Sequence, residues 1–173
     1  MIRAIVCVDK NWGIGKQNGL LFNIPEDMEY FRRTTTGHIV CMGYNTLLSL
    51  PGSKPLKNRT NIIICPEGVV VDEAITVHSL DELFEKLKNF KDEDVYVAGG
   101  AMFYKTMLPY CEEVLVTKVM ADGEAEVFFD NLNDNPNFIL VNNYGIKRSA
   151  SGQIFCFTKY KNNRPLKWSG NNK

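Results

Sequence analysis

Short apolar runs alternate with helical patterns along this chain, and such alternation is typical of βα units. The last three apolar runs have no helical pattern between them, so we expect them to finish the sheet in antiparallel fashion. The pattern therefore predicts a mixed, mostly parallel eight-stranded sheet. The eight expected strands are residues 2–8, 38–42, 60–65, 74–77, 94–100, 112–119, 137–144 and 153–160.

Four segments between the strands have helical patterns: residues 25–33, 43–50, 79–90 and 101–109. In the third, Ser79 and Glu82 have the spacing of a capping box, and the apolar residues that follow recur on one face. No internal repeat or linker divides the chain. We therefore predict one α/β domain over residues 1–161, with about four flanking helices. The polar tail, residues 162–173, has no periodicity, and its composition is compatible with disorder.

Composition narrows the possible partners and the compartment. Lys+Arg 20 balances Asp+Glu 20, so no overall field favours nucleic acid or an anionic membrane, and no apolar run is long enough to span a bilayer. The five cysteines lack a CxxC spacing, and neither His38 nor His78 lies near a cysteine pair. We therefore expect no metal site, and a reduced, cytoplasmic location.

A carboxylate lies on the apolar face of the first expected helix. If that helix begins at Pro25, then Ile24, Asp27, Met28 and Phe31 share one face. The helix terminus favours a charged acid by about 0.3–1 kcal/mol. Burial opposes this, because it raises a carboxyl pKa by up to about 3–5 units. Asp27 is therefore either an ordinary first-turn acid or, if the stripe lines a pocket, a proton donor or ligand anchor.

Two glycine turns follow expected strands, "CMGYNT" at residues 41–46 and "AGGAMF" at residues 98–103. Glycine lets backbone approach a ligand closely, and the helix that follows presents N–H groups to phosphate. The three-glycine dinucleotide fingerprint is absent, and a tight turn explains each segment equally well. Two such turns at neighbouring strand ends would suit a ligand with several phosphates.

Three further features have both a functional and an ordinary interpretation. Arg59 could bind a carboxylate or lie on the surface. Thr117, in an apolar strand, could orient a ligand or only pack. The glycine-rich segment 12–19 could be a lid or a simple loop.

The order of these signals resembles the dihydrofolate reductase family. The resemblance rests on "IVCVDKNWGIGKQNGLLFNIPEDMEYFRRTTTGHIVCMGYNT", "LKNRTNIII", "VYVAGGAMFY" and "VLVTKV", and it extends over about residues 2–160. It implies reduction of 7,8-dihydrofolate to tetrahydrofolate by NADPH, in one-carbon metabolism, with antifolate inhibitors as further ligands. It also implies that Asp27 binds the pterin and promotes protonation of its ring nitrogen.

The resemblance assigns roles by position. It implies catalytic roles for Asp27, Thr117 and Phe22, with Thr117 orienting the carboxylate. Besides Asp27 and Thr117, the implied substrate-binding residues are Ile5, Met28, Phe31, Arg32, Leu56, Arg59 and Ala98. The implied cofactor-binding residues are Cys7, Ile14, Gly15, Asn18, Gly43, Tyr44, Asn45, Thr46, Cys65, His78, Gly99, Gly100, Ala101, Met102, Phe103 and Tyr104.

Four positions depart from the family pattern. Phe22 stands where Trp is common and lacks its N–H donor, and Leu21 stands where Pro is usual. Tyr44 stands where a cation often pairs with the 2′-phosphate of NADPH, and Ala101 replaces a common glycine. Possible substitutes for the missing cation are Lys54, Lys57 and His78.

Two other functions are compatible with parts of the pattern. The pyrimidinone reductase of riboflavin synthesis would share the cofactor half of the fold, although the Asp27 helix, Arg59 and Thr117 argue against it. A non-catalytic nucleotide-binding protein is the other alternative, because of Phe22 and Tyr44. For the dihydrofolate reductase interpretation, we expect a monomer.

Overall fold

The computed structural model describes residues 1–168 of the chain. The tail predicted at residues 162–173 extends past them, so its last five residues lie outside the described part. Before that, Asn162 is still the last residue of a strand, the backbone N–H of Leu166 donates to the Pro109 carbonyl (2.9 Å), and Trp168 stacks on Phe84 (5.5 Å between ring centroids).

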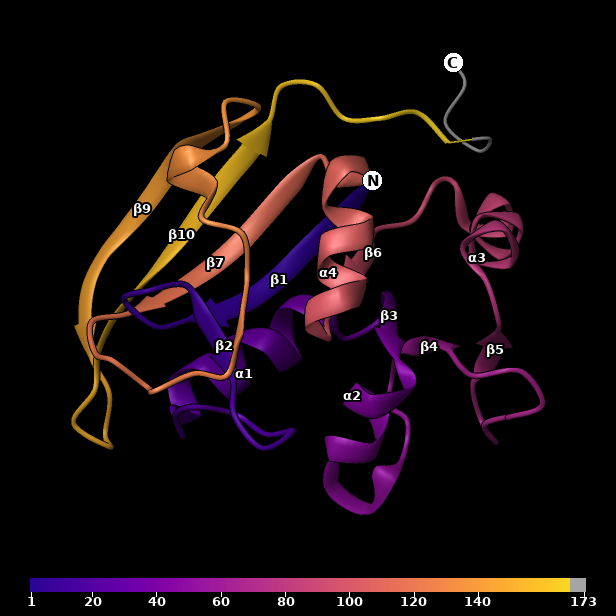
Figure 1. Cartoon of the computed structure of the whole chain (residues 1–173), viewed down its shortest axis with the longest axis horizontal. Helices are drawn as coiled ribbons and strands as arrows, with labels where there is room; N and C mark the ends of the chain where they lie inside the picture. Colours follow the sequence, from indigo (N-terminus) through magenta and orange to yellow (C-terminus); the bar gives the residue numbers. More distant parts are fainter. Residues whose placement is uncertain (169–173) are drawn as a thin grey trace.

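The main sheet has eight strands in the order β5-β4-β3-β6-β1-β7-β10-β9, which confirms the predicted mixed sheet (Figure 1). Neighbours from β5 to β7 pair in parallel, and the reversal comes at β10, which is antiparallel to both β7 and β9. The strands are β1 (Ile2–Val8), β3 (Ile39–Gly43), β4 (Thr60–Ile64), β5 (Ile75–Val77), β6 (Val95–Val97), β7 (Glu113–Val119), β9 (Phe138–Arg148) and β10 (Ile154–Asn162).

A second sheet, which the sequence pattern did not predict, pairs β2 (Gly13–Gly15) with β8 (Val127–Phe128). Its strands are too short to give an alternating pattern. Three-residue 3-10 turns lie at Pro51–Ser53, Lys88–Phe90, Leu108–Tyr110 and Leu132–Asp134.

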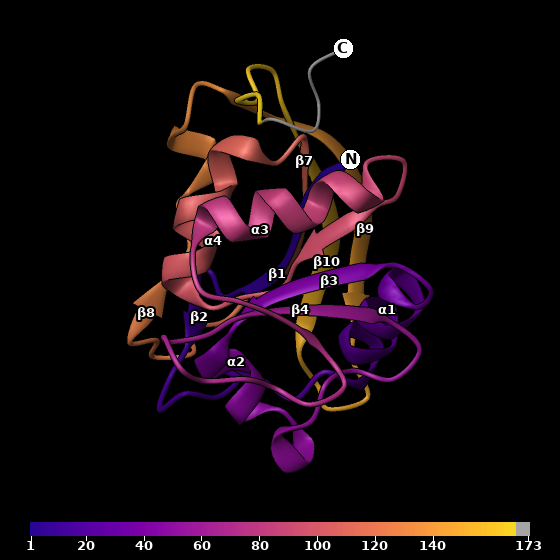
Figure 2. The ribbon, with the colours of Figure 1, turned by 90° about the vertical axis from the view of Figure 1, so that its right-hand side faces the viewer.

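Four α-helices cover the two faces of the main sheet: α1 (Pro25–Thr35), α2 (Tyr44–Ser49), α3 (Leu80–Leu87) and α4 (Ala101–Met107). Successive side chains of a strand point to opposite faces. In β3, Ile39 and Cys41 accordingly pack with α3 and α4, whereas Val40 and Met42 pack with α2. Figure 2 shows α1 and α4 on opposite sides of the sheet.

Helix α3 begins as predicted at its cap, but only half of the capping box forms. The Ser79 hydroxyl accepts from the Glu82 N–H (3.1 Å). The Glu82 carboxylate accepts from the N–H of His78 (2.9 Å), one residue before the position that a capping box uses.

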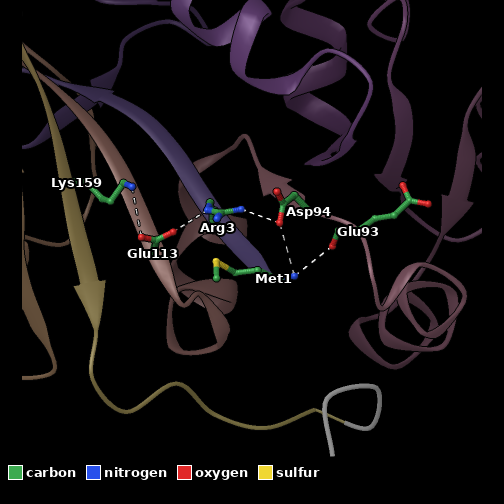
Figure 3. A network of polar contacts seen from close by, with 6 residues as sticks. All are labelled: Met1, Arg3, Glu93, Asp94, Glu113 and Lys159. Atoms are coloured by element: carbon green, nitrogen blue, oxygen red, sulfur yellow. Dashed lines mark hydrogen bonds and ion pairs between the residues drawn. The ribbon is translucent and has the colours of Figure 1, made fainter. Parts of the chain in front are cut away.

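Alternating charges join the strands at the end of the sheet where β1 begins (Figure 3). Arg3 binds Asp94 and Glu113, each at 2.8 Å, and Lys159 lies 3.6 Å from the second oxygen of Glu113. The terminal amine of Met1 donates to the Glu93 carbonyl (3.2 Å) and lies 3.9 Å from Asp94. These contacts tie β10, β7 and β1 to the start of β6. The opposite end of the parallel strands carries the glycine turns and the candidate site.

Candidate active site

Asp27 lies in the first turn of α1. Pro25 occupies the first helical position, and Ile24 before it is extended (φ −119°, ψ 99°). The Ile24 carbonyl accepts from the N–H groups of Asp27 (3.0 Å) and Met28 (3.1 Å), which closes the first turn. Acids in this turn and arginines in the last turn both suit the helix dipole. The local sequence therefore fixes the helix start and with it the direction of the Asp27 side chain.

The Asp27 carboxylate reaches the sheet at Thr117. The buried Thr117 hydroxyl donates to Asp27 Oδ1 at 2.6 Å. Cys7 lies beside Thr117, because the two residues are partners in the parallel pairing of β1 with β7. Burial raises the pKa of Asp27, and hydrogen bonds from Thr117 and Cys7 oppose this in part. Asp27 is therefore not a fully solvated first-turn acid but a partly buried carboxylate held by a hydrogen bond.

The apolar stripe around Asp27 packs unevenly. Ile24 is buried, and Phe31 packs against Ile5 of β1. Met28 is 56% exposed and lies outside the hydrophobic clusters, so it does not belong to the core. Phe22 packs beside Ile24 as a partly buried side chain. Phe31 and Phe22 thus pack against two different hydrophobic clusters, one at Ile5 and one at Ile24.

The two glycine turns lie side by side, because β3 and β6 are neighbours in the sheet. The Gly43 N–H donates to the Gly99 carbonyl (2.9 Å). Gly99 has φ +125°, and a side chain added there would meet the Thr46 hydroxyl at 3.3 Å. Gly100 and Gly43 precede α4 and α2, and neither helix start receives a side-chain cap. Backbone amides at both starts are therefore free of side-chain caps.

Two buried side chains near these turns are fixed in the protein. Tyr104 donates from its hydroxyl to the Ile5 carbonyl (2.7 Å). Burial raises the pKa of Tyr104, so it stays a donor. Phe103 is buried in the main core, so any contact that it makes with a ligand must come from its backbone. Ala98 donates its N–H to the Cys41 carbonyl (2.9 Å), and Met102 is 82% exposed.

Tyr44, Cys65 and His78 gather beyond the ends of β3, β4 and β5. Tyr44 and Cys65 belong to one hydrophobic cluster. The His78 Nδ1 lies 3.3 Å from the Cys65 carbonyl and 3.1 Å from the Pro66 carbonyl. These three predicted cofactor-binding residues thus share one region. Lys54 and Lys57 are exposed, and the structure gives neither side chain an ion pair within residues 1–168.

Arg59 lies just before β4, and its side chain contacts the last residue of α1, Thr35. Its Nη1 donates to the Thr35 hydroxyl (3.2 Å), and its Nε donates to the Lys57 carbonyl (2.8 Å). Burial and the nearby charge of Arg32 lower the pKa of Arg59. Two neighbouring guanidinium groups favour an anion between or beside them. Arg32 also pairs with Glu29, three residues earlier on the exposed side of α1.

Two polar residues that the sequence analysis missed hold the loops of the site. Asn61 brackets Leu56: its Oδ1 accepts from the Leu56 N–H (3.0 Å), and its Nδ2 donates to the Leu56 carbonyl (2.9 Å). Buried Asp9 accepts from the N–H groups of Asn11 (2.8 Å), Gly13 (2.7 Å) and Gly123 (2.9 Å). The sequence contained one signal for Asp9: it follows an apolar strand and precedes a glycine-rich loop, where a carboxylate can accept from backbone N–H groups.

The loop that follows Asp9 is held from two sides. Gly15 accepts from the Glu126 N–H (2.8 Å), within the β2–β8 pairing that also sets Ile14 in place. The Asn18 amide donates to the Asn45 carbonyl (3.4 Å) at the start of α2. The segment 12–19 is therefore tied both to β8 and to the start of α2.

These features describe an α/β protein that combines a partly buried acid on α1 with glycine turns at neighbouring strand ends. A family model described as "Dihydrofolate reductase" matches residues 1–162. The chain therefore belongs to the dihydrofolate reductase family, whose members are NADPH-dependent oxidoreductases.

Individual relatives agree with this assignment. The dihydrofolate reductase of Bacillus subtilis is 29% identical over 98% of this chain and 99% of its own. That of Staphylococcus haemolyticus is 34% identical over 76% of this chain and 78% of its own. A structure of "Dihydrofolate reductase from Enterococcus faecalis complexed with NADP(H)and RAB-propyl" superposes with a TM-score of 0.83, at 22% identity, over 94% of this chain and 96% of its own, which supports the fold.

Replacing Asp9 by alanine should destabilise the protein, because three backbone N–H groups lose their acceptor, and the one at Gly13 is buried. We expect a loss of about 2–4 kcal/mol in the free energy of unfolding, measured in urea. Asp130→Ala, which removes an exposed acid, should cost less than about 0.5 kcal/mol. Equal losses in the two variants would contradict the role of Asp9.

The raised pKa of Asp27 predicts a pH-dependent stability difference. The folded chain binds this proton more readily than the unfolded chain, so the wild type loses stability as pH rises from the ordinary carboxyl range through the folded pKa. The Asp27→Asn amide does not titrate there. The stability of Asp27→Asn relative to wild type should therefore increase from about pH 4 to about pH 7.5 in urea unfolding. If the stability of Asp27→Asn relative to wild type stays constant or falls over this pH range, that result would argue against a raised pKa.

Proposed function

We propose that this chain reduces 7,8-dihydrofolate to 5,6,7,8-tetrahydrofolate with NADPH, and that Asp27 binds the pterin and promotes protonation of its ring nitrogen. The observation that carries the proposal is the hydrogen bond between Thr117 and a partly buried Asp27 whose pKa is raised. A carboxyl group whose pKa is raised holds its proton to a higher pH than an ordinary surface acid, which suits a role in proton transfer.

The Asp27 carboxylate can accept two hydrogen bonds from the edge of a pterin ring. As a carboxylate it is a bidentate acceptor, suited to an amide N–H and an adjacent amino group. Thr117 donates to Oδ1 and so holds the rotation of the carboxylate. We assign Phe31 to one face of the heterocycle and the backbone of Ile5 and Ala98 to its edge. Phe22 supplies bulk but no hydrogen-bond donor, so the proton route does not pass through its side chain.

The rest of the substrate would extend along α1 toward Arg59. We assign the glutamyl carboxylate to Arg59, with Arg32 adding positive charge nearby. Leu56, which Asn61 holds in place, and exposed Met28 would contact the middle of the substrate. An exposed methionine on this rim gains burial only when a ligand is bound, which explains why it lies outside the core.

The glycine turns fit NADPH, because their backbone permits close approach and their helix starts have no side-chain caps. We assign the phosphates to Gly43, Asn45, Thr46 and the segment 99–102, and the adenine side to Tyr44, Cys65 and His78. The nicotinamide would lie near Cys7, Ile14, Gly15, Asn18 and Tyr104. When bound, NADPH supplies the hydride, and a proton completes the reduction.

The described part of the chain, residues 1–168, has no helix that is long and apolar enough to cross a membrane. We propose that the protein works as a monomer in the cytoplasm, binds antifolate inhibitors at the Asp27 site and does not bind nucleic acid. The support is the balanced charge and the five cysteines at positions 7, 41, 65, 111 and 156, all of which are free thiols.

The direct test is to mix the purified protein with dihydrofolate and NADPH and to follow the loss of reduced-nicotinamide absorbance. Asp27→Asn should lower the rate at neutral pH by about 10²-fold or more and recover part of it in acid, where the substrate is already protonated. Asp130→Asn should keep the wild-type rate. Wild-type rates for Asp27→Asn at every pH would refute the acid role, and NADH in place of NADPH measures the cofactor preference that Tyr44 leaves open.

A further inference from the structure

Helix α1 presents a second face to a groove that is separate from the Asp27 site. Glu26 and Arg33 line this groove from α1, and Lys147 lines it from the edge strand β9. Its volume is about 720 Å³, within the range of small-molecule sites, and Asp27 is not among its lining residues. We call it the α1–β9 groove. The groove is formed by segments from both halves of the chain.

Aromatic side chains line the α1–β9 groove. Tyr30 and Phe157 lie 4.3 Å apart between ring centroids, at an interplanar angle of 32°. Tyr30 also packs with Tyr96 and Leu115, which line the same groove. Burial raises the pKa of Tyr30 to about 12, so its hydroxyl stays protonated and can donate. This surface suits a flat ring.

Four cationic side chains line the α1–β9 groove, and two of them form no ion pair among the described residues. Arg3 and Lys159 belong to the charge network at the end of the sheet. Arg33 and Lys147 have no ion pair within the described residues 1–168, although the charge of Arg33 helps to lower the pKa of Glu29. Because Arg33 lies on α1 and Lys147 on β9, an anion in the groove could meet positive charge from both walls.

The cations of the groove favour an anionic group of a ligand, whereas Glu26 favours a hydrogen-bond donor. Its Oε1 accepts from the Ala150 N–H (3.2 Å), in the turn between β9 and β10. Its Oε2 is buried and has no hydrogen-bond donor among the described residues. A buried carboxylate oxygen without a donor is costly, and a rotation of the Glu26 side chain toward the groove would let an N–H or O–H group of a ligand satisfy it.

We infer that the α1–β9 groove binds a small planar aromatic anion that also carries one hydrogen-bond donor, such as an amino-substituted aryl carboxylate. The ring packs on Tyr30 and Phe157. The carboxylate of the ligand lies between Arg33 and Lys147, and the donor reaches Glu26 Oε2 once that side chain turns toward the groove. This site takes a ligand independently of the reduction at Asp27.

The test uses 6-amino-2-naphthoate as the probe, titrated calorimetrically into the full chain near neutral pH, where its carboxylate is charged and its amine neutral. We expect saturable binding to one site. Lys147→Gln and Arg33→Gln should each weaken it by about three- to tenfold, as for single charged contacts. Lys161→Gln is the matched control. Lys161 is an exposed lysine of β10 that is not among the residues lining the groove, so its replacement should leave the affinity unchanged.

Two further arms decide which site the probe occupies. In the wild type, 2-naphthoate, which lacks the donor, should bind several-fold more weakly than the probe, and Glu26→Gln should narrow that difference. Asp27→Asn should leave the affinity for the probe unchanged. No saturable binding up to about 5 mM, an equal loss in Lys161→Gln, or a loss confined to Asp27→Asn would each overturn the inference.

Discussion

The hydrogen bond from Thr117 to Asp27 is the interaction on which the site depends. It joins residues 90 positions apart in the sequence and fixes α1 to the centre of the sheet. It also acts against burial: burial favours the protonated acid, while the hydroxyl of Thr117 and the thiol of Cys7 favour the carboxylate. The pKa of the resulting acid is raised, but its carboxylate is still held in one orientation, and both properties suit the proton transfer that we propose.

The sheet gives this interaction its surroundings. The strand β1 lies between β6 and β7, so Cys7 and Thr117 lie side by side and the glycine turn after β6 follows on the next strand. At the other end of the same strands, Arg3 links two carboxylates and holds β1, β6 and β7 in register. The ends of parallel strands that carry the loops are therefore free to form a ligand site. Helix α1 serves both this site and the groove on its other side.

Much of this arrangement could be predicted from the sequence, because the features involved are local. Strand runs, the proline at the start of α1 and the glycine turns are set by neighbouring residues, and the family resemblance ordered them into one site. Asp27 could be singled out by helical spacing, but spacing alone left two interpretations open. The pKa direction depends on Thr117 and on burial, which only the folded chain supplies.

What could not be predicted depends on long-range contacts. Asp9 binds Gly123, and Glu82 reaches His78 and not Ser79, for reasons of geometry that no periodicity encodes. The two-stranded sheet of β2 and β8 is too short to give a pattern. Met28 has helical spacing that suggests the core, yet it lies exposed at the rim. The α1–β9 groove is lined by residues from α1 and from strands far apart in the sequence, so no single segment of the sequence could predict it.

The most direct measurement is a carbon-13 NMR titration of the Asp27 carboxyl in the free protein, assigned by the loss of its signal in Asp27→Asn. The account predicts a midpoint above the ordinary aspartate value of about 3.9, and a still higher midpoint in Thr117→Val, which removes the opposing hydrogen bond. A midpoint at or below the ordinary value, unchanged by Thr117→Val, would contradict it.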